Sequence, residues 1–504
     1  MTALLVGGFV QFTSLEYLLF LGLSVAVYFA LPGPRTRTLG LLAASYTFYF
    51  SLSARWTLAL ISITAIGYAF GLAIAASGAG APVPRKTKRL LALGIVLVAG
   101  ALFYFKYAAF SAGLLNSGLA LAGVSWRSPA LAIALPVGIS FWTFQSIAYL
   151  VDVAKGTVPP ERNPLRYALF IAFFPQVTAG PIARAGQLLP QLAEKRPFDF
   201  ERMRSALVLM AWGFFKKLVV ADPLGVVVRT VFSKPHEFGD NGIVLAGAAV
   251  AFAVQIYCDF SGYTDLARGA ARLLGIDLMP NFARPYAARS IKEFWRRWHM
   301  TLMSWLKDYV YIPLGGSRVS KWRRYGNILA VFLFSGLWHG AGLTFIVWGL
   351  VNGLYQVLGE LLAPARARVL ALVRITRDSA LHHALQVITT FGLATIAWVF
   401  FRAESLADAL YILPRMFWLD PRPLLSGGIP DLGLAKAQLL VTAVAVVVVF
   451  GLEYLSARRD LTALLYRQHV AVRWIVYYAA ALAILIFGYY GPMSTAADFA
   501  YFKF

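Results

Sequence analysis

Long apolar runs recur along the chain and alternate with short polar or basic segments. A helix needs about 20 apolar residues to cross a hydrocarbon core of roughly 30 Å. The runs lack the apolar–polar alternation of a transmembrane barrel. We therefore predict an all-α polytopic membrane protein with about 11–13 transmembrane or re-entrant helices. The runs without acidic or basic residues are 56–84, 90–105, 107–126, 128–151, 243–258, 325–359, 379–401, 437–452 and 474–497, and apolar segments that carry a charge are 15–31, 163–183, 203–232 and 298–314.

Composition agrees with this pattern. Hydrophobic residues make up 59% of the 504 residues and charged residues 14%, whereas soluble chains carry about 25% charged residues. No repeat or low-complexity segment marks off a second domain, so we expect one membrane domain over residues 1–504. The N-terminus lacks the basic segment and cleavage site of a removable signal, so 15–31 is expected to be the first retained helix.

The chain is strongly basic, with a net charge of +23. In a soluble protein this balance would suggest nucleic acid, but here it fits the positive-inside rule and anionic lipid headgroups. We therefore expect the lipid bilayer, and no nucleic acid, as the partner of these charges. The basic clusters are expected to face the cytoplasm, and they are Arg85, Lys86, Lys88 and Arg89; Arg284, Arg289, Lys292, Arg296 and Arg297; Arg318, Lys321, Arg323 and Arg324; and Arg366, Arg368, Arg374 and Arg377.

The sequence gives little support for metal or thiol chemistry. Cys258 is the single cysteine, so no intramolecular disulfide can form, and it has no basic neighbour in sequence to activate it. No histidine or cysteine spacing typical of a metal site appears, so we expect no metal. Asp259 and Asp265 flank a short polar segment, and Asp265 precedes Arg268 by one helical turn. A structural ion pair is the favoured interpretation.

His339 is the first candidate for chemistry. It lies within 325–359, between Gly336 and Gly340 in the sequence SGLWHGAG. A titratable side chain at membrane depth is costly and usually faces the protein interior or an aqueous cavity. The small neighbours would allow a ligand or another backbone to approach closely. The imidazole is therefore either a general base or a hydrogen-bonding group between helices.

His299 is the second candidate. On one continuous helix it would share a broad face with other apolar and aromatic side chains, namely Trp295, Trp298, Leu302, Trp305, Leu306 and Tyr309. This pattern favours an interfacial amphipathic helix, a helix that lines a cytoplasmic entrance, or both. The turn after it, Pro313 to Arg318, contains two glycines and ends in a base. It is either a plain turn or a phosphate-binding turn that uses its backbone amides.

These residues resemble the motifs of the membrane-bound O-acyltransferase family, in the branch of bacterial alginate O-acetyltransferases and D-alanyl transfer proteins. The core motifs lie within 135–359, and weaker similarity covers nearly the whole chain. Four blocks carry the resemblance: LPVGISFWTFQ at 135–145; FFPQVTAGPI at 173–182; YCDFSGY at 257–263 with NF at 281–282, FWRRWH at 294–299 and PLGGS at 313–317; and LWHG at 337–340. WVFFRA at 398–403 is a weaker match.

The resemblance implies a ring of membrane helices around a central tunnel, with the acyl donor arriving from the cytoplasm. It implies that His339 is the catalytic histidine and that His299 is its second motif histidine. Acetyl-CoA would be a co-substrate, and no bound cofactor is expected. The expected donor-binding candidates are Arg296, Arg297, Trp298, Asp308, Gly315, Gly316, Ser317 and Trp338.

The C-terminal segment 498–504, DFAYFKF, resembles an aromatic tail of alginate acetylases. Tyr501 is accordingly a candidate acyl relay, and a simple aromatic membrane anchor is the alternative. The family implies acetyl transfer to an extracytoplasmic polysaccharide at the inner membrane, through an SGNH-type acetyltransferase partner. D-alanyl transfer to teichoic acid from a carrier-protein thioester remains an alternative, as do lipid or protein acylation and a transporter or channel.

Overall fold

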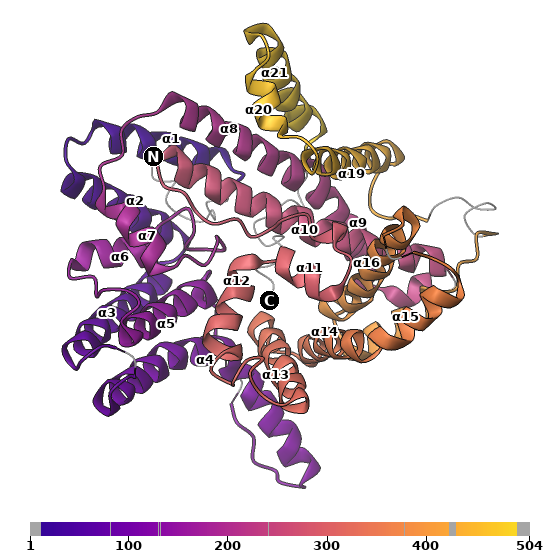
Figure 1. Ribbon diagram of the computed structural model, residues 1–504, viewed down its shortest axis with the longest axis horizontal. Helices are drawn as coiled ribbons and strands as arrows, with labels where there is room; N and C mark the ends of the chain where they lie inside the picture. The colour runs from indigo at the N-terminus through magenta and orange to yellow at the C-terminus, as the bar shows by residue number, and fades with distance from the viewer. Residues whose placement is uncertain are drawn as a thin grey trace. The chain divides into compact units, whose positions relative to one another are not determined.

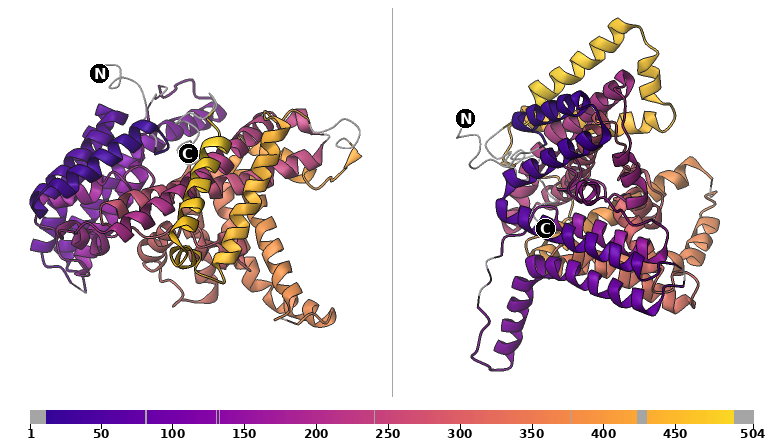
Figure 2. Two further views of the ribbon diagram at one scale, coloured as in Figure 1. Left: turned by 90° about the horizontal axis from the view of Figure 1, so that it is seen from above. Right: turned by 90° about the vertical axis from the view of Figure 1, so that its left-hand side faces the viewer.

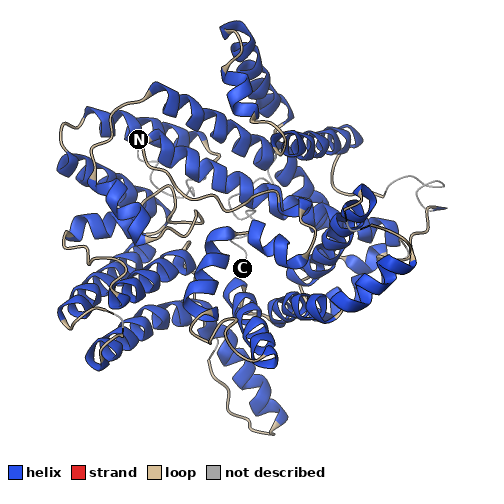
Figure 3. Ribbon diagram, in the orientation of Figure 1, coloured by secondary structure: helices blue, strands red, loops and turns tan. Residues whose placement is uncertain are grey.

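The computed structural model describes residues 12–80, 82–129, 131, 133–239, 241–376, 378–422 and 430–490. All regular elements within these ranges are helices (Figure 3), which confirms the all-helical prediction. Contacts divide the chain into two compact units. Unit 1 comprises Met1–Met210 and Thr264–Pro280, and unit 2 comprises Ala211–Tyr263 and Asn281–Phe504. The expectation that 1–504 forms one membrane domain stays a prediction.

Unit 1 contains the N-terminal helices (Figure 1). The first two motif blocks pack together in it. The Gln145 amide donates to the carbonyl of Phe170 (2.6 Å), and so does that of Gln176 (3.1 Å). The helices are α1 (Leu15–Ala30), α2 (Pro34–Leu52), α3 (Ala54–Ala76), α4 (Arg85–Leu121), α5 (Ile139–Lys155), α6 (Pro164–Ala172), α7 (Ala185–Ala193) and most of α8 (Phe200–Phe214).

Unit 2 contains both candidate histidines. Helix α10 (Gly242–Leu273) begins in this unit and ends in unit 1. The other helices are η2 (Phe215–Ala221), α9 (Asp222–Ser233), η3 (Pro235–Phe238), η4 (Pro285–Ala287), α11 (Ile291–Arg297), α12 (Met300–Leu306), η5 (Lys307–Tyr311), α13 (Lys321–His339), α14 (Leu343–Leu361), α15 (Ala363–Leu372), α16 (Ala380–Arg402), α17 (Leu406–Arg415), α19 (Lys436–Ser456), α20 (Leu461–Tyr466) and α21 (Val470–Phe487).

Within the described ranges, six helices are long and apolar enough to cross a membrane: α3, α4, α10, α16, α19 and α21. The pair α14 and α15, bent by 58°, would make a seventh span. The protein is therefore a multi-pass membrane protein. Helix α21 (yellow in Figure 2) has no buried residue, as expected for a lipid-facing helix. The total of about 11–13 helices predicted from the sequence also includes shorter and re-entrant helices. That total stays a prediction.

The helix boundaries differ from those expected from the hydrophobic pattern at three places. The run 90–105 and most of the run 107–126 form one helix, α4, which ends at Leu121, because a single intervening lysine does not interrupt a helix. The run 325–359 is broken after His339. The continuous helix predicted over 295–309 is wrong, since α11 ends before His299 and α12 begins after it.

The core of unit 2 is dominated by aromatic side chains from helices far apart in sequence. Trp298 lies 5.0 Å from Trp398, and Trp348 stacks on Trp398 at 5.7 Å (ring centroids). Trp298 and Trp348 are almost completely buried. An interfacial helix would keep its apolar face against lipid, so the interfacial interpretation of 295–309 is also wrong for this buried face.

Candidate active site

His339 is the last residue of α13, and the chain turns back immediately into α14. Gly340 and Gly342 are extended in this turn. The two helices approach closely because a Cβ on Gly336 would lie 2.3 Å from the carbonyl oxygen of Phe345, and one on Gly349 would lie 2.4 Å from that of Phe332. Only glycine permits this contact. The close hairpin places the His339 ring inside unit 2, with 4% of the residue exposed.

Aromatic rings enclose His339. Its ring centroid lies 4.8 Å from that of Trp338, 4.9 Å from Trp348 and 5.2 Å from Phe401. These rings come from α13, α14 and α16, and all three contacts are edge-to-face. Such an enclosure excludes water and strengthens electrostatic interactions with the imidazole.

His299 occupies the break between α11 and α12 in a left-handed backbone conformation, with φ 44° and ψ 54°. This conformation is uncommon for a non-glycine residue, and such strain is concentrated at functional sites. Asn281 holds the turn. Its carbonyl accepts from the Met300 amide at 2.9 Å, and its side-chain Oδ1 accepts from the Thr301 hydroxyl at 2.6 Å. The strained turn is therefore fixed by hydrogen bonds from outside its own helices.

The structure brings the two histidines together around one indole. The His299 ring lies 5.8 Å from Trp338, which in turn contacts His339. Phe260 of α10 covers another side of His299 at 4.7 Å. Burial lowers the pKa of the His299 imidazole to about 3, so this ring is neutral at pH 7. It can therefore accept or donate a hydrogen bond without carrying charge.

Sequence reasoning missed several residues of this site. Asn352 accepts from the Trp295 indole at 3.2 Å and donates to the carbonyl of Trp348 at 2.8 Å, which ties α11 to α14. Phe401 and Trp348 approach His339 from outside its own motif. No local signal marks these residues, although Phe401 lies within the weaker motif WVFFRA at 398–403.

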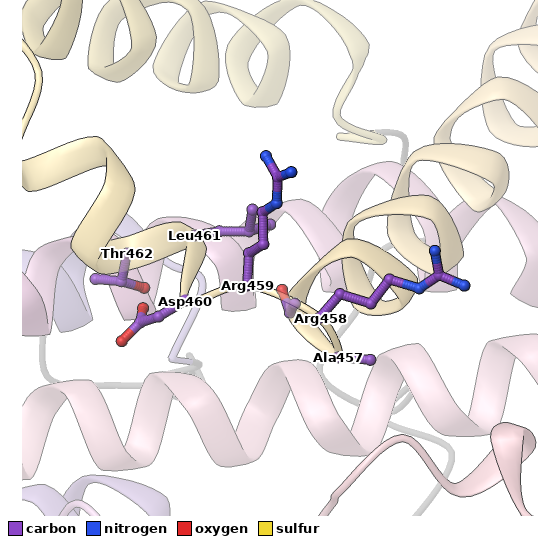
Figure 4. Close-up of a pocket in the computed structure, with 7 residues that line it drawn as sticks. Ala457, Arg458, Arg459, Asp460, Leu461 and Thr462 are labelled. Atoms are coloured by element: carbon purple, nitrogen blue, oxygen red, sulfur yellow. The ribbon is translucent and has the colours of Figure 1, made fainter.

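The structure describes a surface pocket away from these side chains. It has a volume of about 420 Å³ and is lined by the turn 456–462 between α19 and α20 (Figure 4). Figure 4 shows the guanidinium groups of Arg458 and Arg459 pointing in different directions. None of the residues around the histidines lines this pocket. Its exposed arginines stand at the end of a candidate span, where anionic lipid headgroups are expected.

Comparison with known proteins identifies the chain. The model of the MBOAT, membrane-bound O-acyltransferase family matches residues 41–403. The chain belongs to the membrane-bound O-acyltransferase family. This membership makes the protein an acyltransferase, and the histidines, the aromatic enclosure and the glycine hairpin all lie within the matched residues.

Three relatives in this family show the range of named acceptors. A probable alginate O-acetylase of Pseudomonas aeruginosa is 37% identical over 86% of this chain and 80% of its own length. A peptidoglycan O-acetyltransferase of Helicobacter pylori is 36% identical over 66% of each chain. A teichoic acid D-alanyltransferase of Bacillus subtilis is 28% identical over 43% of this chain and 56% of its own length.

The donor-binding candidates separate into buried and accessible groups. Trp298 and Trp338 are buried, so they serve the core around the histidines. Arg296 is exposed, whereas Arg297 forms an ion pair with Glu293 and donates to the carbonyl of Arg284. Arg296 is therefore the more accessible of the two arginines to a soluble phosphate.

The two glycine amides of the turn donate hydrogen bonds within the turn. The Gly315 amide donates to Ile312 and the Gly316 amide to Tyr311, both at 2.9 Å. Asn327 of α13 donates to the carbonyl of Gly316. These two amides are therefore already used within the turn, and phosphate binding by the turn stays a prediction. Ser317 is exposed, and Asp308 lies 3.8 Å from the Nζ of Lys307. The accessible cations beyond the turn are Arg318, Lys321 and Arg323.

The two adjacent arginines should behave differently when each is replaced by alanine. Arg296→Ala is expected to raise the KM for a phosphate-bearing acyl donor about 10-fold, the effect of losing a charge-assisted hydrogen bond, without changing thermal unfolding. Arg297→Ala should instead lower the free energy of unfolding by about 1 kcal/mol, because Glu293 and the Arg284 carbonyl lose a donor. Donor titration in reconstituted membranes and thermal unfolding measure the two effects. A raised KM for Arg297→Ala with unchanged unfolding would contradict this division.

Proposed function

We propose that the protein is an inner-membrane O-acetyltransferase. It moves acetyl groups from cytoplasmic acetyl-CoA to hydroxyl groups of an extracytoplasmic, alginate-like polysaccharide. The observation that carries the proposal is the joint burial of His339 and His299 around Trp338. The choice of acetyl group and acceptor is supported by the 37% identity to a probable alginate O-acetylase over 86% of this chain.

The chemistry assigned to His339 is that of a general base. One ring nitrogen accepts the proton of the acceptor hydroxyl as its oxygen attacks the thioester carbonyl carbon. The carbon–sulfur bond then breaks, and the imidazolium returns the proton to the departing thiolate. The products are an O-acetyl ester and a free thiol, and the histidine is regenerated. His299, neutral and held by its strained turn, positions the donor or polarises its carbonyl.

We assign the binding of the acyl donor to the basic end of unit 2. Acyl-CoA carries several phosphate charges, and exposed guanidinium groups bind phosphate with paired hydrogen bonds. Arg296 and the cations beyond the glycine turn, Arg318, Lys321 and Arg323, are exposed there. The proposal assigns this end to the cytoplasm because basic residues are retained on that side.

The acceptor side involves a partner and the C-terminal tail. We assign onward transfer to an SGNH-type extracytoplasmic acetyltransferase, since the family resemblance implies such a partner. Tyr501 is the candidate acyl relay, and it lies outside the residues that the structure describes, as does the tail 498–504. Its phenol would receive the acetyl group as an ester and pass it on. The support for this step is the sequence DFAYFKF alone.

Membrane vesicles that contain the protein and its polymer-acetylating partner can test the reaction. Acetyl-CoA labelled in the acetyl group is supplied at the cytoplasmic face, and label in the purified polymer is measured. We expect ester-linked acetyl, released by mild alkali. In parallel vesicles the donor is a D-alanyl carrier protein. Label transferred only from that donor would contradict the acetyl proposal and favour D-alanyl transfer.

A further inference from the structure

Gly262 of α10 lets a neighbouring segment of unit 2 pack very closely against this helix. A Cβ on Gly262 would lie 2.8 Å from the carbonyl oxygen of Gly213, which stands just before the end of α8. The same Cβ would lie 3.4 Å from the Cβ of Lys216 in η2. A side chain at this position would prevent the approach. The chain that leads from α8 into η2 therefore lies directly on the Gly262 face of α10.

Two polar contacts lie on either side of this close approach. The Lys216 ammonium donates to the Ser261 hydroxyl at 2.9 Å. The Lys217 ammonium lies 2.7 Å from the carboxylate of Asp259. Successive residues of an α-helix are rotated by about 100°, so Ser261 lies about 100° to one side of Gly262 and Asp259 about 60° to the other. The two contacts together fix the rotation of α10 about its own axis.

Phe260 projects from the opposite side of the same helical turn. By the same rotation it lies about 160° from Gly262. Its ring meets the His299 ring edge-to-face, with 4.7 Å between centroids and an interplanar angle of 85°. Phe260 is almost completely buried, and close packing leaves its ring little freedom to move independently of α10. A rotation of α10 would therefore carry Phe260 across the His299 ring.

Stability alone does not account for this arrangement. Lys216 and Asp259 are at most 3% exposed, and buried charged groups can often be replaced by apolar ones of similar volume without loss of stability. Hydrogen bonds and ion pairs depend on direction as well as distance, so contacts on both sides of Gly262 select one rotation of the helix. The π-helical turn that supplies them is of a kind often found at functional sites.

We propose that Lys216 and Lys217 of η2 are positioning residues for His299, which they orient through α10 and Phe260. The inference rests on the proposed function, because it assigns a role in the same reaction. A misplacement of about 1 Å in a reacting group lowers a rate about 100-fold. A small rotation of α10 is therefore enough to affect transfer, although neither lysine is assigned a contact with the substrate.

Removal of one polar contact, with the packing retained, tests the inference. Lys216→Met combined with Ser261→Ala replaces both partners by apolar groups, a change that is often nearly neutral for stability. We expect this double variant to lower the rate of acetyl transfer about 10–100-fold, while thermal unfolding stays close to that of wild type. In a His299→Ala background it should lower the rate no further, because its effect passes through that ring.

A second measurement needs no turnover. The protein contains six histidines, so protein with isotope-labelled histidine in nanodiscs gives few ring resonances in NMR spectra. The resonance that is absent from His299→Ala identifies His299. We expect this resonance to move in the double variant, and also in Phe260→Leu, because the aromatic ring beside the imidazole is displaced in the first and removed in the second.

Two further variants guard the interpretation. His236→Gln removes a partner of Asp408, 3.6 Å away, in a contact between η3 and α17 of the same unit. It should change neither the His299 resonance nor the rate. If the double variant fails to fold, Ser261→Ala alone keeps both lysines and should move the His299 resonance in the same direction by a smaller amount.

Three results would overturn the inference: an unmoved His299 resonance in the folded variant, an unchanged rate of transfer, or an equal loss of rate with and without His299. The two proposals fail in distinguishable ways. If the wild-type protein transfers no acetyl group but the His299 resonance moves, the proposed function is wrong and the coupling of η2 to His299 stands. If the wild-type protein transfers acetyl and the resonance does not move, only the positioning role is wrong.

Discussion

Replacing His339 by alanine is expected to lower acetyl transfer about 10²–10⁴-fold, the usual effect of removing a positioned acid–base group. The ring lies in an enclosure of Trp338, Trp348 and Phe401, whose indole and phenyl groups offer no substitute base. The measurement is acetyl content of the polymer, together with the initial rate in membrane vesicles. Membrane insertion and folded yield should remain close to those of wild type.

Two variants control for the cavity that alanine leaves. His339→Gln keeps most of the side-chain volume and a hydrogen-bonding group but cannot act as a base near pH 7, so it should be nearly as inactive. His382→Ala removes a histidine from the first turn of α16, at the opposite end from Phe401, and should leave the rate unchanged. Near-normal transfer by both His339 variants would exclude the general-base assignment.

The fold class and the first histidine follow directly from the sequence. Apolar runs of spanning length dictate membrane helices, because the backbone must satisfy its own hydrogen bonds in lipid. His339 is conspicuous because it interrupts a run that contains no acidic or basic residue. The break after His339 is also encoded locally, since Gly340 and Gly342 can adopt the extended turn and Gly336 admits the returning helix.

The surroundings of His299 could not be predicted in the same way. Aromatic residues continue at helical spacing through the break, so the periodicity of 295–309 favours one helix. What interrupts it is the hydrogen bonding from Asn281, a long-range contact that no local pattern reports. The sequence likewise does not show that Arg296 is exposed while Arg297 is ion-paired. This difference depends on which face of the short helix α11 packs against the rest of the protein.

The sequence predicts the ion pair of one interior aspartate but not that of the other. The expected pairing of Asp265 with Arg268 is confirmed at 3.5 Å. Asp259, by contrast, pairs with Lys217 of η2 at 2.7 Å. The π-helical turn of η2 lets two consecutive lysines reach α10, since Lys216 donates to the hydroxyl of Ser261 at 2.9 Å. Such turns are rare and often functional, and no pattern in the sequence indicates this one.

Lys217→Met is expected to destabilise the protein by about 3–5 kcal/mol, the effect of removing one partner from a buried ion network. The ammonium of Lys217 lies 2.8 Å from Asp222 and 2.7 Å from Asp259, and all three side chains are largely shielded from solvent. Without the cation, two neighbouring carboxylates would repel each other in a medium of low dielectric constant. Thermal unfolding of purified protein and the folded yield would report the loss.

A triple variant separates this electrostatic effect from a loss of packing. Lys217→Met combined with Asp222→Asn and Asp259→Asn removes all three charges, and it should recover most of the lost stability. Because Phe260, the neighbour of Asp259, packs on the His299 ring, the triple variant also reveals whether the network matters for catalysis. Restored folding with a lowered turnover rate would show that the ion network orients Phe260 and His299. Equal stability of the single and triple variants would mean that the methyl-terminated side chain, and not the missing charge, causes the damage.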